Sequence, residues 1–280
     1  MKFAYGRTKE KDADVILFGV PDQSGSHAKR KGQAKGPDAI RKISNREAWV
    51  SETSRYQAQS GPVCVKTHDI GNIKKSQVAK KAAAIAKAGK KVAVLGGDHS
   101  ITFKVLQGLT QHHKNIAVIY FDTHPDFVCS RNEKYFGSVM CDTQHLKGIA
   151  FNKSSILGIR AIEPEERKNI KKSGITSFTT LDIEEKGVKK VAQQIKKIVG
   201  KNKVYLSIDL DVLDPSVAPG VSTPYPGGLQ TLQLLCLTKE FSKLNLVGFD
   251  IMEYTPKYDI NDRTGHLATI LGLEILKSMQ

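Results

Sequence analysis

The stretch NIAVIYFDTHPD, residues 115–126, joins a continuous apolar run to three possible metal ligands, Asp122, His124 and Asp126. An apolar run without polar alternation is typical of a parallel strand that is buried on both faces. Alternate residues of a strand lie on one face, so the three polar side chains would share one side. We therefore expect a parallel sheet with a polar site where this strand ends.

Similar apolar runs recur along the chain, and helix-like segments separate them. They predict strands at 14–20, 91–97, 115–122, 154–160, 175–181, 203–211 and 245–253. The segments between them predict helices at 36–44, 76–89, 164–174, 188–200, 229–244 and 265–279. Strand and helix alternate without a linker or a repeat, which indicates one α/β domain, residues 1–280, with a parallel sheet.

The composition is ordinary for a globular protein, but the charge is not. The chain has 43 Lys and Arg against 28 Asp and Glu, a net charge of +15. Such a balance raises the possibility of a nucleic-acid partner. The basic residues are scattered, however, and few aromatic residues lie among them to stack on bases. We interpret the lysines as a solvated surface and expect no nucleic-acid partner.

The lack of targeting signals and the pattern of the cysteines predict a location in the cytoplasm. No apolar run reaches the roughly 18 residues that a membrane helix needs, and the first 20 residues lack the features of a signal peptide. The spacing of the four cysteines fits neither a zinc finger nor a disulfide framework; they are Cys64, Cys129, Cys141 and Cys236. We therefore expect a protein of the reducing cytoplasm without a membrane partner.

Acids and histidines collect at the ends of four predicted strands. The four segments are GGDHS (96–100), FDTHPD (121–126), SIDLDVLDP (207–215) and DIMEYTP (250–256). So many carboxylates at one edge of a sheet require bound cations to offset their repulsion and desolvation. Two histidines with several carboxylates suit a pair of first-row divalent ions, and the oxygen-rich set favours manganese over zinc or magnesium. A two-metal site activates water, which predicts a metal-dependent hydrolase.

These four segments, in this order, resemble the ureohydrolases, the family of arginase and agmatinase. The segments at 19–41 and 218–229 are also similar to that family, so the resemblance spans nearly the whole chain. It implies a three-layer, arginase-like α/β fold with a central, mostly parallel sheet flanked by helices. It also implies two Mn²⁺ ions per subunit and a homo-oligomer, a trimer or hexamer.

The resemblance also implies roles for particular residues. One metal would be held by His99, Asp122, Asp126 and Asp209, and the other by His124, Asp122, Asp209 and Asp211. Asp126 would also orient the hydroxide that attacks the substrate. Glu253 would bind and pair with the substrate guanidinium, with Thr223 beside it in the pocket. Asp98 is expected to support a ligand and Asp214 to cap a turn, while Asp250 has no assigned role.

The chain departs from the family in the loop YFGSVMCDTQHLKG, residues 135–148. The family usually carries a histidine there that moves a proton and helps to position substrate. Ser138 stands at the matching position, with Val139 as an alternative, and we expect Ser138 to contact substrate. His145 would reach the site only if the loop ran differently, and water, Cys141 or Asp142 could substitute for the histidine.

Several substrates are compatible with these residues. The apolar pair Phe127 and Val128 after Asp126 argues against a nearby α-carboxylate and favours agmatine, which would give putrescine and urea. Arg131 keeps guanidinobutyrate open, and arginine is a further alternative. A relative that binds metal but has weak or no activity is the competing hypothesis, because the loop histidine is absent.

Overall fold

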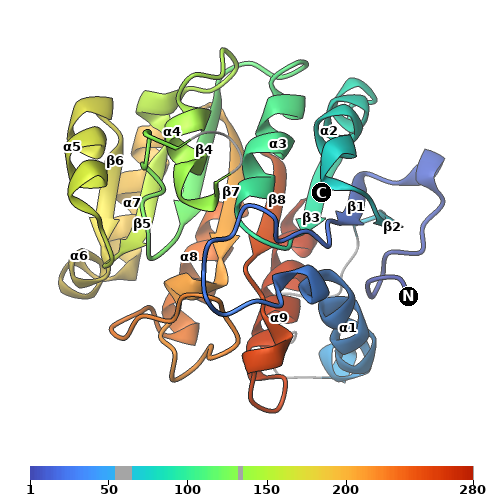
Figure 1. Ribbon diagram of the computed structural model, residues 1–280. Coiled ribbons are helices and arrows are strands. Elements are labelled where there is room, and N and C mark those ends of the chain that lie inside the picture. The colour runs from blue at the N-terminus through green and yellow to red at the C-terminus, as the bar shows by residue number, and fades with distance from the viewer. Residues whose placement is uncertain (54–64, 132–134, 280) are drawn as a thin grey trace.

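Eight strands form one sheet. Figure 1 shows the computed structural model, which describes residues 1–53, 65–131 and 135–279. The order across the sheet is β2-β1-β3-β8-β7-β4-β5-β6, and every pairing of neighbours is parallel. The strands are β1 Val15–Gly19, β2 Thr67–Asn72, β3 Lys91–Leu95, β4 Ile116–Phe121, β5 Ser155–Ile159, β6 Thr176–Thr179, β7 Lys203–Asp209 and β8 Leu246–Met252.

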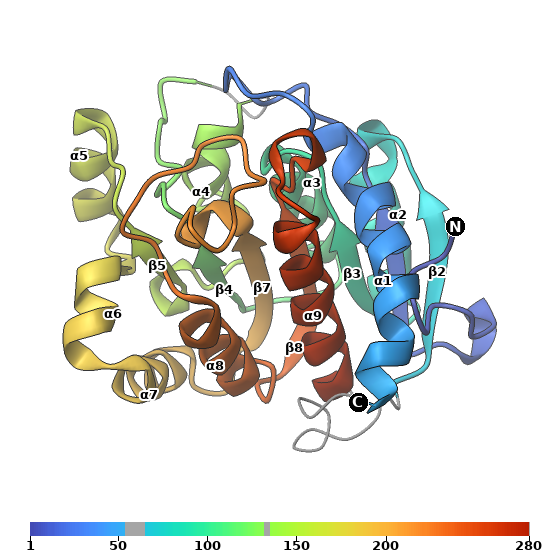
Figure 2. The same ribbon diagram turned by 90° about the horizontal axis from the view of Figure 1, so that it is seen from below.

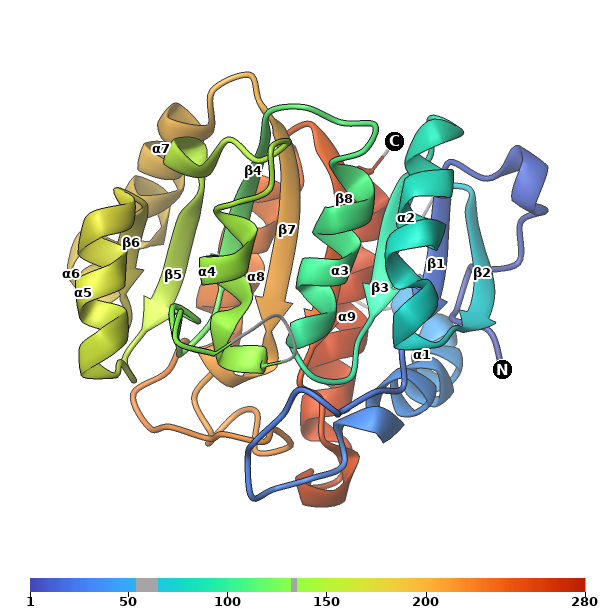
Figure 3. The same ribbon diagram turned by 45° about the horizontal axis from the view of Figure 1, so that its top comes forward.

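Helices cover both faces of the sheet and complete three layers (Figures 2 and 3). One face carries α1 Gly36–Thr53, α6 Thr180–Lys186, α7 Val188–Val199, α8 Thr231–Phe241 and α9 Arg263–Ser278. The other face carries α2 Val78–Lys87, α3 Ser100–Leu109, α4 Val139–Thr143 and α5 Pro164–Ser173. The expected three-layer fold with a parallel central sheet is therefore confirmed. None of the helices in the described ranges is both long and apolar enough to cross a membrane.

Strand β4 illustrates why the central runs are apolar throughout. Ala117, Ile119 and Phe121 pack into the cluster on the α1 and α9 side. Val118 and Tyr120 pack into the cluster on the α2 and α3 side. Because both faces of the strand are covered, neither face selects polar residues.

Some elements were not predicted because their residues show neither a clear strand pattern nor a clear helix pattern. Strand β2, of sequence THDIGN, lies at the sheet edge and is only partly buried. Helix α3 is buried at most of its positions, which hides the helical period. The predicted strand at 175–181 ends early, because Thr179 accepts a hydrogen bond from the Asp182 backbone and starts α6. Helix α1 also runs beyond its predicted end at residue 44.

The four strands that lead into the acidic segments are neighbours in the sheet. Their order is β3-β8-β7-β4, although β3 and β8 lie far apart in the sequence. Because the strands are parallel, their carboxyl ends meet at one edge. The fold thus places all four segments around one point.

Candidate metal centre

The segment GGDHS makes a tight turn between β3 and α3. A Cβ atom on Gly97 would lie 1.8 Å from the carbonyl oxygen of Asp22, and one on Gly96 would lie 1.7 Å from Met252 Sδ. Only glycine fits such close approaches. The turn delivers His99 to the start of α3 with 1% of its surface exposed.

A first group of ligands surrounds His99. Its Nδ1 atom lies 2.9 Å from Asp122 Oδ2, 3.0 Å from Asp209 Oδ2 and 3.9 Å from Asp126 Oδ2. These three carboxylates are buried. The set is the one that the sequence predicted for the first metal.

A second group lies beside the first and shares Asp122. His124 Nδ1 is 3.4 Å from Asp122 Oδ1 and 3.2 Å from Asp211 Oδ2. The two oxygens of Asp122 thus face different histidines. Backbone amides orient the carboxylates: the His124 amide donates to Asp122 Oδ1 and the Asp211 amide donates to Asp209 Oδ1, each at 2.7 Å.

The electrostatics of the two groups are those of a site built for cations. Burial, followed by repulsion from neighbouring carboxylates, raises the pKa of Asp126 and of Asp209 well above the usual range. Burial lowers the pKa of His99, but hydrogen bonds and attraction from Asp122 and Asp209 outweigh it and leave this pKa well above its usual value. Divalent ions bound here would offset the buried negative charge.

The donor set fits divalent metal ions. The atoms of His99, Asp122 and Asp126 lie within 4.8 Å of one another, as do those of Asp122, His124 and Asp211. Carboxylate oxygens and imidazole nitrogens are ligands that manganese accepts.

Asp250, which had no predicted role, supports His99 through a serine. His99 Nε2 lies 2.9 Å from Ser207 Oγ, and Ser207 Oγ donates to Asp250 Oδ1 at 2.7 Å. Asp250 also accepts hydrogen bonds from Thr102 and Tyr205. This chain fixes the imidazole so that Nδ1 faces the carboxylates. Ser207 could not be identified from the sequence, because its partners His99 and Asp250 come from distant parts of the chain.

Glu253 lies beside the centre, but it is not on the cavity wall. The residue has φ 66° and is 1% exposed. Its Oε1 atom accepts the His99 amide at 3.0 Å, and its Oε2 atom accepts hydrogen bonds from Ser222 and Gln33. Burial and repulsion from Asp98 raise the pKa of Glu253 to about 7. In this arrangement Glu253 positions His99, and a guanidinium would have to displace Gln33 or Ser222.

A cavity of about 430 Å³ opens onto the metal ligands. Thr223 lies on its wall and donates from Oγ1 to Asp211 Oδ2 at 2.7 Å. The wall also carries two carboxylates, Glu163 and Glu166. Apolar and aromatic side chains complete it, among them Val128, Phe136, Ala161, Ile162 and Tyr225.

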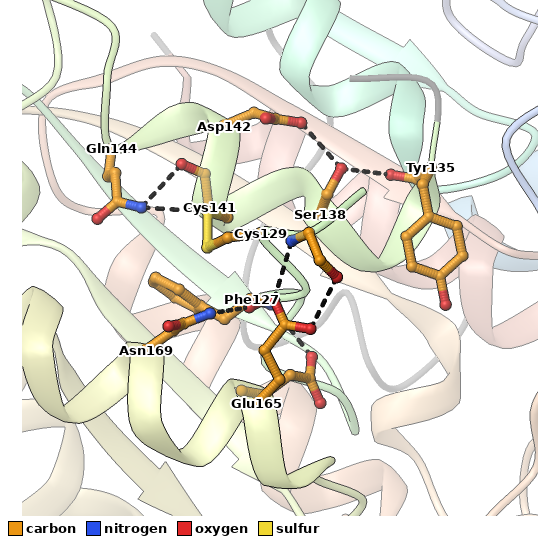
Figure 4. The surroundings of a disulfide bond; sticks show 11 residues. Phe127, Cys129, Tyr135, Ser138, Cys141, Asp142, Gln144, Glu165 and Asn169 are labelled. Carbon is orange, nitrogen blue, oxygen red and sulfur yellow. Dashed lines mark hydrogen bonds between the residues drawn. A yellow bond between two sulfur atoms is a disulfide. The ribbon is translucent and has the colours of Figure 1, made fainter. Parts of the chain in front are cut away.

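The structure does not bring Ser138 to this cavity. The cavity wall in the described part of the loop consists of Tyr135, Phe136 and Gly137. Ser138 is buried, and its single hydroxyl proton is shared between the Tyr135 carbonyl at 2.9 Å and Asp142 Oδ2 at 2.8 Å, as Figure 4 shows. Phe136, two residues earlier, is one of the loop residues that line the cavity.

The alternatives named for this loop lie elsewhere too. Val139, Cys141, Asp142 and His145 are not on the wall that the structure describes for this cavity. Cys141 is instead bonded to Cys129, with Cα atoms 5.5 Å apart (Figure 4). The expectation that the cysteines form no disulfide is therefore wrong. A separation of 12 residues in the sequence does not indicate that two cysteines are paired. Here the fold brings Cys129, after β4, close to Cys141 in α4.

Two further acids act on loops: Asp214 caps a turn as expected, whereas Asp98, expected to support a ligand, holds a loop instead. Asp98 Oδ2 accepts the Gly25 and Ser26 amides at 2.7 and 3.0 Å, which fixes the loop before α1. Asp214 Oδ2 accepts the Gly227 and Gly228 amides at 2.8 and 3.0 Å and closes the turn after β7.

The chain matches the Arginase family over residues 13–277. An agmatinase of Blochmanniella floridana is 35% identical over 94% of this chain and 87% of its own length. Among solved structures, proclavaminate amidino hydrolase of Streptomyces clavuligerus has a TM-score of 0.87 at 29% identity, covering 99% of this chain and 96% of its own. Agmatine ureohydrolase of Thermoplasma volcanium has a TM-score of 0.85 at 27% identity, covering 99% and 94%. The chain therefore belongs to the arginase family, and it is a ureohydrolase, a hydrolase of carbon–nitrogen bonds in linear amidines.

Proposed function

We propose that this protein hydrolyses agmatine to putrescine and urea at a centre of two manganese ions. The observation that carries the proposal is Asp122, whose two oxygens face His99 and His124 in two adjacent groups. A carboxylate shared in this way would hold two ions close together, as in a two-metal centre. A release of putrescine would give the protein a part in polyamine biosynthesis.

The chain's own residues divide into two metal sites. His99, Asp122, Asp126 and Asp209 would hold one ion, and His124, Asp211 and the two shared aspartates the other. Ions bound there supply Lewis-acid chemistry and make a water molecule nucleophilic at neutral pH. Manganese is favoured because the set is mostly oxygen but includes imidazole.

The cavity wall favours a substrate with a second positive charge. The acids Glu163 and Glu166 line the wall, and the apolar residues Ala161 and Ile162, which also line it, suit an aliphatic chain. Agmatine carries a guanidinium and an ammonium on such a chain, whereas guanidinobutyrate and arginine carry a carboxylate that these acids would repel. Arg131, which kept guanidinobutyrate open, has its guanidinium 4.4 Å from the centre of the Tyr135 ring.

The residues that would act on the substrate are partly in place. Thr223 faces the cavity next to Asp211. Asp126 lies among the ligands, where its carboxylate could hold the proton of an attacking water. Glu253 as partner of the guanidinium stays a prediction, since its fork-shaped pairing needs the oxygen that Ser222 and Gln33 now occupy. A substrate contact from Ser138 is not favoured by the direction of its side chain.

A second function is favoured by Phe136. Phe136 lines the cavity in the loop where the family usually has a histidine, and a phenyl ring cannot transfer a proton. A metal-binding relative with weak or no catalytic activity is therefore the alternative. Positioned acid–base catalysis is worth about 10²–10⁴-fold, so its loss could leave slow turnover.

Urea release separates the two functions. The manganese-loaded protein is assayed with agmatine, guanidinobutyrate and arginine, and Asp122→Asn serves as the inactive control. Turnover of agmatine with the highest kcat/KM supports the proposal. Binding of manganese without urea release from any of the three supports the alternative.

Location and assembly are further parts of the proposal. We propose a cytoplasmic homo-oligomer, a trimer or hexamer, on the resemblance to the family. The Cys129–Cys141 disulfide argues against the cytoplasmic location, because disulfides are more common in oxidising compartments. Cell fractionation tests the location, and light scattering of the purified protein tests the assembly.

A further inference from the structure

Tyr120 contacts the metal ligands and was not predicted as a site residue. It lies on β4, two residues before Asp122, and is fully buried. Its ring lies almost parallel to the imidazole of His99, with centroids 4.5 Å apart and an angle of 8° between the planes. The phenol ring therefore covers one face of a ligand.

The hydroxyl of Tyr120 reaches a second ligand. It donates a short hydrogen bond to Asp126 Oδ2 and lies 3.0 Å from His99 Nδ1. A phenol hydroxyl carries one proton, and here that proton is directed at the Asp126 carboxylate.

Asp126 is a residue whose position needs such support. Its φ of 55° lies in the left-handed region that aspartate seldom adopts. Its carbonyl accepts the Met140 and Cys141 amides at 3.1 and 3.2 Å, which holds the backbone. The bond from Tyr120 holds the carboxylate, so backbone and side chain are fixed separately.

We propose that Tyr120 is a positioning residue, which fixes His99 by stacking and Asp126 by its hydrogen bond in the places where they ligate a metal ion. The inference rests on the proposed metal centre. It predicts that the donor on Tyr120 raises the affinity of the site that contains His99 and Asp126. Tyr120 contacts His99 and Asp126 through its side chain, so the site that contains His124 and Asp211 should be less affected.

The test is manganese binding to chelator-stripped protein, followed by calorimetry and by electron paramagnetic resonance. Tyr120→Phe keeps the stacked ring and removes only the donor, and we expect the first site to weaken by about 10–100-fold. Tyr254→Phe is the matched control: this phenol also donates to a carboxylate, that of Asp259 at 2.9 Å, away from the ligands. It should lower the melting temperature without changing manganese affinity.

A double-variant cycle with Asp126→Asn shows whether Tyr120 acts through Asp126. If it does, the effect of Tyr120→Phe shrinks in the Asp126→Asn background. Wild-type affinity in a folded Tyr120→Phe, or an undiminished effect beside Asp126→Asn, would overturn the inference. Tyr120→His, which keeps a flat ring and a donor, should recover part of the affinity and guards against a phenylalanine variant that does not fold.

The outcome is separable from that of the proposed function. A wild-type protein that binds no manganese overturns both. A wild type that binds two ions but releases no urea overturns the proposed hydrolysis, while weaker binding by Tyr120→Phe still supports the positioning role.

Discussion

Ser138 donates a hydrogen bond to Asp142 at 2.8 Å, and this bond directs the serine away from the metal cavity. Figure 4 shows that the Ser138 hydroxyl also lies within hydrogen-bond distance of the Tyr135 carbonyl. Phe136 and Tyr135 line the cavity instead. Phe136 is therefore a position from which a loop side chain could exchange a proton with the site.

A histidine in place of Phe136 should increase turnover. Phe136→His would bring an acid–base group to the cavity wall, and we expect kcat on agmatine to rise toward the lower end of the about 10²–10⁴-fold that such groups provide. The pH profile of kcat should gain a limb near the histidine pKa of about 6.5. Steady-state urea release from pH 5 to 9 measures both quantities.

The control for this experiment is Ser138→His. Its side chain would start from a buried position that points at Asp142, so neither the rate nor the pH profile should improve. A gain with Ser138→His and none with Phe136→His would reverse the assignment of the two positions.

Sharing of Asp122 predicts unequal effects of ligand substitutions. Asp122→Asn should weaken both metal sites, because its two oxygens face different histidines. His124→Asn should weaken only the site that contains Asp211. Metal content after dialysis, measured by mass spectrometry, should fall from two ions to none for the first variant and to one for the second. Asp214→Asn, which alters a turn outside the ligand set, should retain both ions.

Glu163 should select for a cationic tail. Glu163→Gln removes a carboxylate from the cavity wall, and a solvent-screened ion pair of about 1 kcal/mol corresponds to a KM for agmatine raised about fivefold. The KM for guanidinobutyrate should fall or stay the same. Glu165→Gln is the matched control, because the Glu165 carboxylate accepts hydrogen bonds from Ser130 instead of lining the cavity. Equal effects of both variants on agmatine would argue against a role in selection.

The gathering of the candidate metal ligands at one place could be predicted because parallel strands end at one edge of the sheet. His99, Asp122 and Asp209 follow apolar runs whose parallel ends must meet, so one motif constrains the next. Loop residues follow no regular period, so the sequence could not show which of them lines the cavity. Ser138 was expected there, but Phe136, two positions earlier, lines it. Tyr120 was overlooked because its position in an apolar strand suggested only packing.

The Cys129–Cys141 disulfide should stabilise the loop beside the cavity. It links residues 12 apart, and loops of this size yield about 2–4 kcal/mol by restricting the unfolded chain. We expect Cys129→Ser with Cys141→Ser to lower the free energy of unfolding in urea by that amount. Dithiothreitol should bring the wild type to the same value and leave the double variant unchanged. Cys236→Ser, at an exposed free thiol, is the control and should have no effect.

Arg41 and Asp69 form a buried ion pair that joins α1 to β2. Arg41 donates from Nε to Asp69 Oδ2 at 2.8 Å and from Nη2 to Asp69 Oδ1 at 3.0 Å. Asp69→Asn would leave the arginine charge buried without its partner, which typically costs about 3–5 kcal/mol. Asp38→Asn removes an acid that is 68% exposed on the same arginine, and should cost less than about 1 kcal/mol.

The pH dependence of this cost has a definite sign. Burial raises the pKa of Asp69, but the hydrogen bonds and charge of Arg41 outweigh burial and hold it below the 3.8 of an unperturbed aspartate. The ionised pair therefore contributes its full stability above pH 3.8, and this contribution is lost as the pH falls through the lower value in the folded protein. Urea unfolding of wild type and Asp69→Asn should differ most at pH 7 and converge in acid. A difference that stays constant down to pH 2 would mean that Asp69 acts through packing and not through its charge.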